Sequence, residues 1–362
     1  MTPRFRPATD ADHAAWQDFL ARTASGDFLH DWGWSTVAAH DGEPQRRFVL
    51  EQGGAIVAIA AAQVRRLRLG RSMWYVPHGP VLDYEDPAAR RRLAAVAAGL
   101  RDAARRDRAI AVKLEPRLAA GAPQLATFAL RGVRRAGPTV QVGQTRIVPL
   151  LEDEALLASF DKDTRYAVRR AEREAVQVAQ IDDAADLSAI DRLHELVGET
   201  QRRAGFPMPA LRRYRLAWQS LAAEGTASIF EARRHGELLA SAMLVVEGDR
   251  SFYLFAGSRR EERGAPKRFA TYALQWAMMR HARDGGVRCH DLWGIAPPGA
   301  GEDHPWYGVG LFKKGFGGDE VVWAGTWDIV VDPRLYRLRE AVARLRGGAR
   351  GGLRRLRRRL AR

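Results

Sequence analysis

The stretch GVGLFKKGFGGDEVVWAGTWD, Gly308 to Asp328, carries the strongest signal for the fold of this chain. Two adjacent lysines follow a phenylalanine, and glycines flank this run: Phe312, Lys313, Lys314, Gly310, Gly315, Gly317 and Gly318. Glycine permits positive φ and close backbone approach, and lysine supplies a point charge for phosphate or for a developing oxyanion. The stretch therefore indicates either a site for an anion and an acyl ester, or a helix end with solvated lysines and a glycine turn before a strand at Val321–Trp327.

Six short motifs stand in a particular order around this stretch. They are Tyr253/Ala256/Gly257/Ser258, Leu274/Gln275/Trp276, Asp291/Gly294, Phe312 to Gly318, Gly325/Trp327/Asp328 and Pro333/Tyr336. In this order they resemble the Fem family of peptidoglycan bridge aminoacyltransferases. The resemblance implies an α/β fold of two tandem acetyltransferase-like (GNAT-like) domains, with mixed sheets flanked by helices. The long coiled-coil arm of some family members is missing from this sequence.

Length and charge set the range of partners. With 362 residues, 46% of them hydrophobic, the chain is long enough for two domains with cores of their own. A net charge of +15 points to polyanionic partners, such as tRNA, a nucleotide diphosphate or an anionic membrane surface.

The single cysteine, Cys289, excludes an intramolecular disulfide and a cysteine-based zinc cluster. No N-terminal run has the order of a signal peptide, and no apolar run reaches the about 18 residues that a membrane span needs. We therefore expect a cytoplasmic protein without a metal site, peripheral at most at the inner face of the membrane.

We expect residues 1–150 to form the first domain, which is the precursor-binding side of the protein. Helices are expected at Pro7–Thr23, Phe28–Ala39 and Pro87–Asp107, and strands at Arg47–Gln52, Ala55–Leu69, Ser72–Val76, Ala109–Pro116 and Val140–Leu150, the last of which closes the domain. Lys113 and Glu115 fall at the carboxyl end of a buried strand, where open α/β sheets often bind ligands.

Two tryptophans near the N-terminus are candidate substrate contacts. The resemblance implies that Trp32 and Trp34 line the nucleotide-precursor side of the first domain, although packing in a core is an alternative. The segment contains no lysine to match the phosphate-binding lysine of the family. His30 and Arg46 are the available substitutes.

The second domain is expected at 151–329, beginning with an acidic helix at Leu151–Phe160. The next helix, Asp161–Val178, carries a basic face for which Lys162, Arg165 and Arg169 are our candidates for binding tRNA phosphates. A solvated charged helix is the alternative.

The rest of the second domain alternates helices and strands. We expect helices at Ala184–Arg203, Ala210–Glu224 and Lys267–Asp284, and strands at Ala227–Arg234, Glu237–Glu247, Ser251–Ala256 and Val287–Leu292. The loop Arg260–Pro266 departs from the phosphate-binding pattern of acetyltransferases. By resemblance, Arg203, Arg213, Tyr214 and Tyr253 are candidate contacts of the peptidyl precursor; an arginine reaching solvent from a helix and a half-buried tyrosine are the alternative for Arg213 and Tyr214.

After Pro333 a helix to Leu345 is expected, and residues 330–345 return to complete the first domain. The tail, counted from Arg344, holds nine arginines and no acid. A basic helix with an apolar stripe would suit anionic lipid or tRNA, and a disordered tail is the alternative.

The resemblance implies transfer of an amino acid from aminoacyl-tRNA, the donor substrate, to the amine of a lipid-linked or UDP-linked muropeptide. No cofactor is expected, and we expect a monomer. Lys313 is our candidate for the cation at the tetrahedral oxygen, with Phe312 beside it and Lys314 as the alternative lysine. Asp291, His290 and Glu302 are the candidate bases.

Two rival functions remain open at this point. One is an acyl-CoA-dependent N-acyltransferase on the same fold, against which the missing phosphate loop argues. The other is a non-catalytic basic module that tethers to membrane or RNA through its tail.

Overall fold

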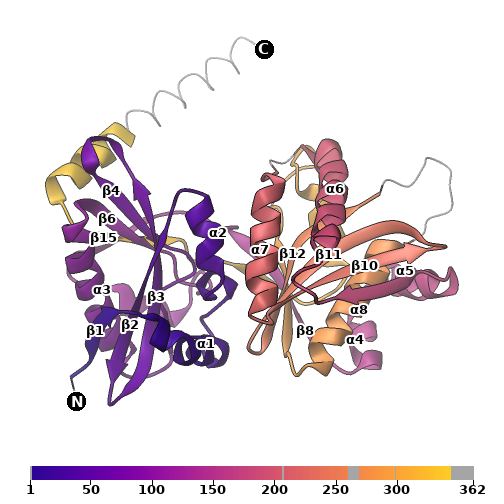
Figure 1. Ribbon diagram of the computed structural model, residues 1–362, viewed down its shortest axis with the longest axis horizontal. Helices are drawn as coiled ribbons and strands as arrows, with labels where there is room; N and C mark the ends of the chain where they lie inside the picture. The colour runs from indigo at the N-terminus through magenta and orange to yellow at the C-terminus, as the bar shows by residue number, and fades with distance from the viewer. Residues whose placement is uncertain (1, 206–207, 260–268, 298, 344–362) are drawn as a thin grey trace, which may run out of the picture.

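The computed structural model describes residues 2–205, 208–259, 269–297 and 299–343. These residues form two β-sheets, side by side, each with helices on both of its faces (Figure 1). The loop expected at Arg260–Pro266 and the tail from Arg344 lie outside the described residues.

The first sheet contains eight strands: β1 (Arg4–Pro7), β2 (Gln45–Gln52), β3 (Ala55–Arg66), β4 (Ser72–Val76), β5 (Val81–Leu82), β6 (Ala109–Leu114), β7 (Val133–Gly137) and β15 (Thr326–Val330). Their order is β1-β2-β3-β4-β6-β15-β7, and β5 pairs with β3. Helix α3 (Ala89–Arg106) packs on one face, and α1 (His13–Arg22) packs on the other. The predicted strands from Arg47 to Val76 and the predicted basic helix are confirmed here.

The second sheet contains seven strands: β8 (Gln144–Pro149), β9 (Gln177–Ile181), β10 (Ala227–Arg234), β11 (Glu237–Glu247), β12 (Arg250–Ser258), β13 (Cys289–Gly294) and β14 (Asp319–Val322). Their order is β14-β8-β13-β12-β11-β10-β9. The helices of this half are α4 (Asp153–Ser159), α5 (Lys162–Arg173), α6 (Leu187–Ala204), α7 (Leu211–Ala223), α8 (Ala270–Asp284) and α9 (Tyr307–Lys314). Helices α5 and α8 share one core with the sheet, and α6 and α7 share another.

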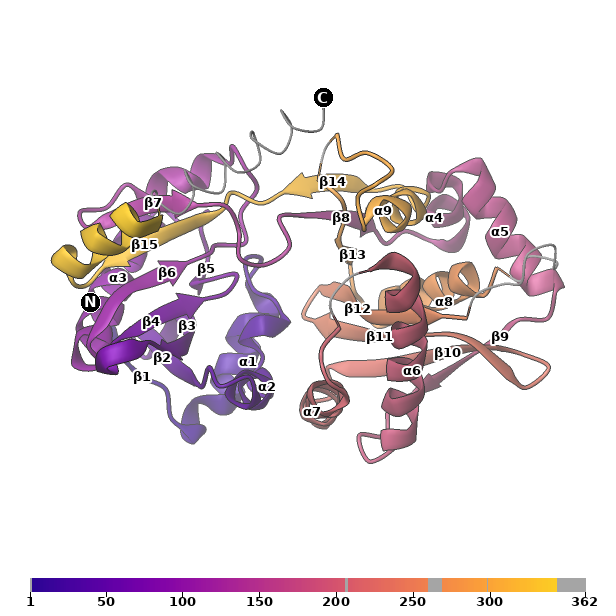
Figure 2. The same cartoon turned by 90° about the horizontal axis from the view of Figure 1, so that it is seen from above.

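Two strands lie in the opposite sheet from the one their sequence position suggests. The strand expected to close the first domain, β8, pairs with β13 and β14 in the second sheet. In return, β15 lies between β6 and β7 in the first sheet. The single strand predicted at Val321–Trp327 is therefore two strands in two sheets. The chain crosses between the halves twice, and the crossings lie side by side (Figure 2), joined by a 3.0 Å bond from Trp323 N to Gly143 O.

The glycines after α9 serve contacts within the protein. Gly317 and Gly318 have φ values of 70° and 67°, and a Cβ on them would meet backbone oxygens of Ser159 at 2.5 Å and Ile147 at 2.2 Å. These glycines let the turn lie against α4 and β8, so the glycine-turn interpretation is correct for them. The close backbone contacts of these glycines are with other segments of the same protein.

A shared core holds the two halves together. Phe28, Trp34 and Val37 from the first half are buried in one cluster with Tyr214 and Trp218 from α7. Helix α2 (Trp34–His40) supplies part of this contact and packs against α7. Burial of several large aromatic rings makes the relative position of the halves a part of the folded state.

A few short elements differ from the sequence-based expectation. The helix expected over Phe28–Ala39 is a 3-10 turn at Phe28–His30 followed by α2, and the one expected at Pro7–Thr23 begins only after Asp12. Strand β9 begins inside the predicted helix Asp161–Val178, and β7 was not predicted at all. Residues 333–343 are helical, as expected. Among the described residues, no helix combines the length and the apolar character that crossing a bilayer requires.

Candidate active site

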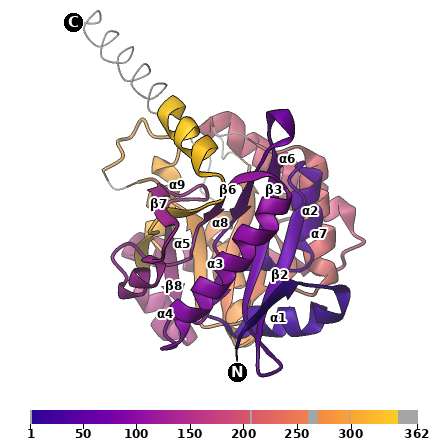
Figure 3. The same cartoon turned by 90° about the vertical axis from the view of Figure 1, so that its left-hand side faces the viewer.

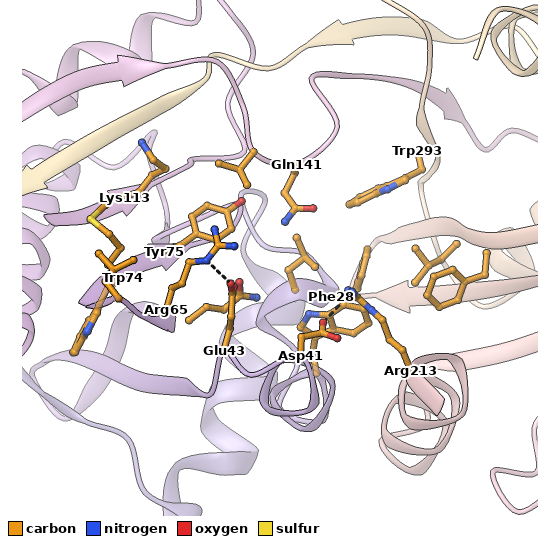
Figure 4. A pocket seen from close by; sticks show the side chains of 18 of the residues that line it. Phe28, Asp41, Glu43, Arg65, Trp74, Tyr75, Lys113, Gln141, Arg213 and Trp293 are labelled. Atoms are coloured by element: carbon orange, nitrogen blue, oxygen red, sulfur yellow. Dashed lines mark ion pairs between the residues drawn. The ribbon is translucent and has the colours of Figure 1, made fainter. Parts of the chain in front are cut away.

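A cleft of about 740 Å³ lies between the two halves (Figure 4). Its walls come from the first sheet, from α2 and α7, and from the end of β13, and they include Phe28, Trp34, Lys113, Gln141, Arg213 and Trp293. Aromatic rings and charged groups line it together. Such a wall suits an extended ligand that has both apolar and anionic parts.

Two of the arginines in this wall are paired with acids. Arg213 Nη1 lies 2.9 Å from Oδ2 of Asp41, so this pair links α7 to the segment after α2. Arg65 Nε lies 3.2 Å from Oε1 of Glu43 (Figure 4). Both side-chain pairs are open to solvent, which makes each bond weak and each arginine available to a stronger anion.

Lys113 lines the cleft from the carboxyl end of β6, as the sequence predicted. Its Nζ atom donates to Oδ1 of Asp328 over 2.7 Å. Glu115, by contrast, is buried and accepts hydrogen bonds from the Tyr75 hydroxyl at 2.5 Å and from the Gln141 backbone N–H at 3.1 Å. Glu115 therefore fixes the wall of the cleft and is itself withdrawn from it.

Lys313 points into the protein from the last turn of α9. Only 6% of its surface is exposed, and its Nζ atom donates a 2.7 Å hydrogen bond to the backbone oxygen of Gly294. The Tyr253 ring lies 5.8 Å from the same Nζ atom. Desolvation lowers the pKa of Lys313 to about 7, against the opposing effect of Asp291. The alternative prediction from the sequence, that this lysine is solvated, is therefore wrong.

The neighbours of Lys313 behave differently. Lys314 is exposed on the other side of α9. The Phe312 ring packs edge-on against Tyr272 at 5.2 Å and Phe316 at 5.1 Å, in the core of the second half. Of the two lysines, only Lys313 lies beside the end of β13.

A buried ionic network fixes the turn that carries the Lys313 contact. Asp291 accepts a 3.0 Å bond from Arg117 of the first half, a bond from the Thr145 hydroxyl, and a 2.8 Å bond from the backbone N of Trp293. Trp293 has a φ of 60°, which is uncommon for a residue with a side chain, and Gly294 follows it. The Trp293 indole lines the cleft, so the cleft wall and the lysine share one turn.

The candidate bases are poorly placed for proton transfer. His290 is fully buried, with Ser251 Oγ at 2.8 Å and Gln275 Oε1 at 3.3 Å from its ring nitrogens. Desolvation, together with the charge of Lys313, lowers the pKa of His290 to about 3. Asp291 is engaged in the network above, and Glu302 is exposed.

The two candidate tryptophans lie in different parts of the first half. Trp34 is buried, lines the cleft, and packs edge-on against Phe28 at 5.2 Å. Trp32 is not part of the cleft wall; the Arg47 guanidinium lies 3.7 Å above its ring and His13 stacks on it.

The remaining precursor candidates also differ in position. Arg213 lines the cleft, whereas Tyr214 is buried between His194 and Phe255, where desolvation raises the pKa of its hydroxyl to about 12. Arg203 is in the last turn of α6, and its side chain lies outside the described part of the molecule.

Neither substitute for the missing lysine reaches the cleft wall. His30 is fully buried, and Arg46 pairs with Asp107 at 2.6 Å and covers the Trp74 ring.

The basic helix α5 lies at the end of the second half that is remote from the first sheet (Figures 1 and 2). Lys162 and Arg169 are exposed there. Arg165 instead folds back and donates to the carbonyl oxygens of Phe160 and, at 3.3 Å, Ala158. It caps the α4–α5 turn.

Two family models match the two halves of the chain. Residues 12–131 match the FemAB family, and residues 158–305 match the acetyltransferase (GNAT) domain. The solved structure of FemX superposes with a TM-score of 0.82 at 21% identity, covering 92% of this chain and 99% of that one. Residues 12–131 thus resemble the FemAB family, and the chain shares the fold of FemX.

Curated Fem-type relatives match over nearly the whole length. The UDP-N-acetylmuramoylpentapeptide-lysine N(6)-alanyltransferase of Weissella viridescens is 24% identical, over 89% of this chain and 94% of that protein. The lipid II:glycine glycyltransferase of Staphylococcus saprophyticus is 23% identical, over 92% and 94%. The tandem acetyltransferase-like fold that the motifs implied is thus confirmed.

Several cleft residues escaped sequence reasoning. Arg65, Asp41 and Glu43 lie in turns or strand ends where a charged residue is ordinary. Arg117, which binds Asp291 and is not in the cleft wall, stands two residues beyond the predicted ligand position Glu115, and this spacing was the one available hint.

Proposed function

We propose that this chain transfers an amino acid from aminoacyl-tRNA to the amine of a peptidoglycan stem peptide, in the formation of interpeptide bridges. The curated relatives, which match over almost their full length, are named for transfer of alanine or glycine to such precursors. The observation that carries the proposal is the position of Lys313, buried beside the turn whose tryptophan lines the cleft.

The reaction needs orientation and charge stabilisation more than covalent help. The acceptor amine attacks the ester carbonyl carbon, and the carbonyl electrons move onto oxygen. The ester C–O bond to the tRNA ribose then breaks as the amide C–N bond remains, and the amine proton passes to the released ribose oxygen through solvent or substrate groups. Orientation can supply several kcal/mol, and a cation at the oxyanion a few more.

Lys313 is the residue to which we assign this cation. One of its N–H donors is used by Gly294, which leaves two for a tetrahedral oxygen. His290 is neutral at physiological pH because burial lowers its pKa, so it adds no competing charge. We assign the precursor to the cleft, where Arg213 and Lys113 offer cations for an anionic group and Trp34 and Trp293 offer flat apolar surface.

A reconstituted assay tests this function. Purified protein is incubated with charged tRNA pools and a muropeptide precursor, and products are read by mass spectrometry. An added amino-acid mass that depends on intact tRNA supports the proposal. A product that survives RNase and requires acyl-CoA would replace it with the N-acyltransferase alternative.

A further inference from the structure

One end of the first half exposes apolar side chains among arginines. We define the leucine–arginine surface as Arg66, Arg68, Leu69, Arg337, Leu338 and Val342, all of which are exposed. Arg66 ends β3, Arg68 and Leu69 belong to the β3–β4 connection, and the other three belong to the helix at 333–343. Figures 1 and 3 place these two segments at the same end of the molecule.

Contacts hold the two segments together. Arg71 Nη1 lies 3.3 Å from Oδ2 of Asp332, just before the helix. Beneath them, Met73 and Tyr336 are buried in one small core against which Leu67 and Leu335 pack. The surface is therefore a fixed feature of the fold.

Leu69 is the least expected residue of this surface. It is 90% exposed, and its φ of 58° and ψ of 31° are left-handed, a conformation that leucine seldom adopts. On the neighbouring helix, Leu338 is 60% exposed, and Val342 lies one turn further on the same face. A strained and solvated leucine beside two more exposed apolar side chains suggests a partner that covers them.

The charges around these side chains are unbalanced. Arg66, Arg68 and Arg337 make no ion pair with any other described residue. Nine more arginines follow in sequence after Ala343, where the described chain ends at this surface. The partner must therefore be both anionic and able to accept apolar side chains.

We propose that the leucine–arginine surface docks the protein on an anionic lipid bilayer. Leucines and a valine enter the interface between headgroups and acyl chains, and the arginines meet lipid phosphates. RNA would use the cations but not the aliphatic side chains, and no exposed aromatic ring for base stacking lies on this surface. A second copy of the chain would bring like charges together.

The surface also borders the cleft. Arg65, near the end of β3, and Leu67, in the β3–β4 connection, line the cleft, and Arg339 lines it from the helix that carries Leu338. A bilayer at this end would meet the cleft at its rim. This second step rests on the proposed function: among the two acceptor forms, the geometry selects a precursor that is linked to membrane lipid.

Vesicle binding tests the surface. The full chain is sedimented with phosphatidylcholine vesicles that contain or lack phosphatidylglycerol. We expect binding only to the anionic vesicles, and about tenfold weaker binding for Leu69→Glu/Leu338→Glu and for Arg66→Glu/Arg68→Glu. The matched controls Leu151→Glu/Leu311→Glu, two exposed leucines of the second half, and Arg90→Glu/Arg91→Glu, on α3, change the net charge by the same amounts and should bind like the wild type.

Unchanged vesicle binding by both surface variants would overturn the proposal. The proposal would also be overturned if the surface variants kept the lipid interaction and instead lost binding to tRNA, or lost a concentration-dependent dimer.

Turnover then separates this inference from the proposed function. With a lipid-linked acceptor in the same vesicles, the surface variants should lose rate in proportion to binding, and with a soluble UDP-linked acceptor they should keep the wild-type rate. A wild type that uses only the soluble acceptor would refute the lipid-linked assignment. A wild type that uses neither acceptor would refute the proposed function and leave the vesicle result standing.

Discussion

The Nζ atom of Lys313 is bonded to the backbone oxygen of Gly294, and that oxygen belongs to a turn held by an arginine from the other half of the molecule. Arg117 binds Asp291, Asp291 binds the backbone N of Trp293, and Gly294 comes next. The position of the lysine thus depends on the contact between the two halves. Each link of this chain of contacts can be tested separately.

Replacing Lys313 with alanine should lower kcat about 100-fold, because a charge at the oxyanion is lost. The ratio of wild-type to variant rate should fall as pH rises, since burial lowers the pKa of Lys313 to about 7 and the amine is protonated only below it. Between pH 6 and pH 8 the ratio should decrease by about tenfold. Using the ratio cancels ionisation of the acceptor amine.

Lys314→Ala is the matched control for this experiment, since its side chain is exposed on the same helix, and it should retain the wild-type rate. A ratio that rises with pH would mean that the neutral amine acts, as a base, and would contradict the assigned role.

Arg117→Met should destabilise the fold by about 3 kcal/mol, because it leaves the Asp291 carboxylate buried without its cation. Arg117→Met combined with Asp291→Asn should cost less than the sum of the two single changes. Urea unfolding of the four proteins gives this coupling directly. Arg135→Met is the control. The Arg117 guanidinium lies over the Trp323 ring at 5.0 Å, and Arg135 likewise covers the Trp327 ring but pairs with no acid among the described residues, so we expect a smaller loss. Full additivity would show that the two residues act independently.

The sequence could predict that one of the two lysines points inward but not which one. Successive residues of a helix are turned by about 100°, so Lys313 and Lys314 cannot share an environment. Which of the two lysines points inward depends on where the end of β13 lies, and this position is set by the tertiary structure. Arg165 shows the same limit: its spacing matches Lys162 and Arg169, yet it binds the carbonyl oxygen of Phe160.

The positions of the strands in the sequence were easier to predict than the strands with which they pair. β8 and β15 have ordinary strand sequences, but pairing in the opposite sheet is decided by contacts between segments far apart in the chain. The motifs around Asp291 and Phe312 indicated the family because they follow one another in a recognisable order. Arg65 in the cleft wall and Arg117, which binds Asp291, belong to no such motif, so their roles became visible only in the folded chain.

Arg213→Ala should raise KM for the precursor about tenfold and leave kcat nearly unchanged, if this arginine binds an anionic group of the substrate in the cleft. Asp41→Asn should lower KM, because Asp41 competes for the same guanidinium at 2.9 Å. Arg215→Ala is the control, since Arg215 lies on the same helix and pairs with Asp191 outside the cleft wall. Steady-state kinetics with varied precursor decide the matter, and equal KM values for Arg213→Ala and Arg215→Ala would exclude Arg213 from the binding site.

Lys162→Glu/Arg169→Glu should weaken tRNA binding and flatten its dependence on salt, because each lost phosphate contact lowers the slope of log K against log salt by about one. Filter binding at several salt concentrations measures this slope. Arg90→Glu/Arg91→Glu, on α3 of the first half, changes the net charge by the same amount and controls for its loss. A parallel decrease in both proteins would mean that only total charge matters.

We expect Glu247, whose charge would interact with Asp31 of the first half, to make the stability of the protein depend on pH. It is 3% exposed at the end of β11, and no hydrogen-bond partner of its Oε2 atom is found among the described residues. Desolvation, together with the charge of Asp31 from the first half, raises the pKa of Glu247 to about 8, against the effect of Arg250. The folded state therefore holds a proton that the unfolded state releases near pH 4.5. Stability should decrease as pH rises from about 5 to 8.

Glu247→Gln should remove this part of the decrease and melt at a higher temperature than the wild type at pH 8. Thermal melts at several pH values test it, with Glu237→Gln, at the exposed start of the same strand, as the control. Equal slopes for the wild type and Glu247→Gln would show that the carboxyl group is already ionised at neutral pH.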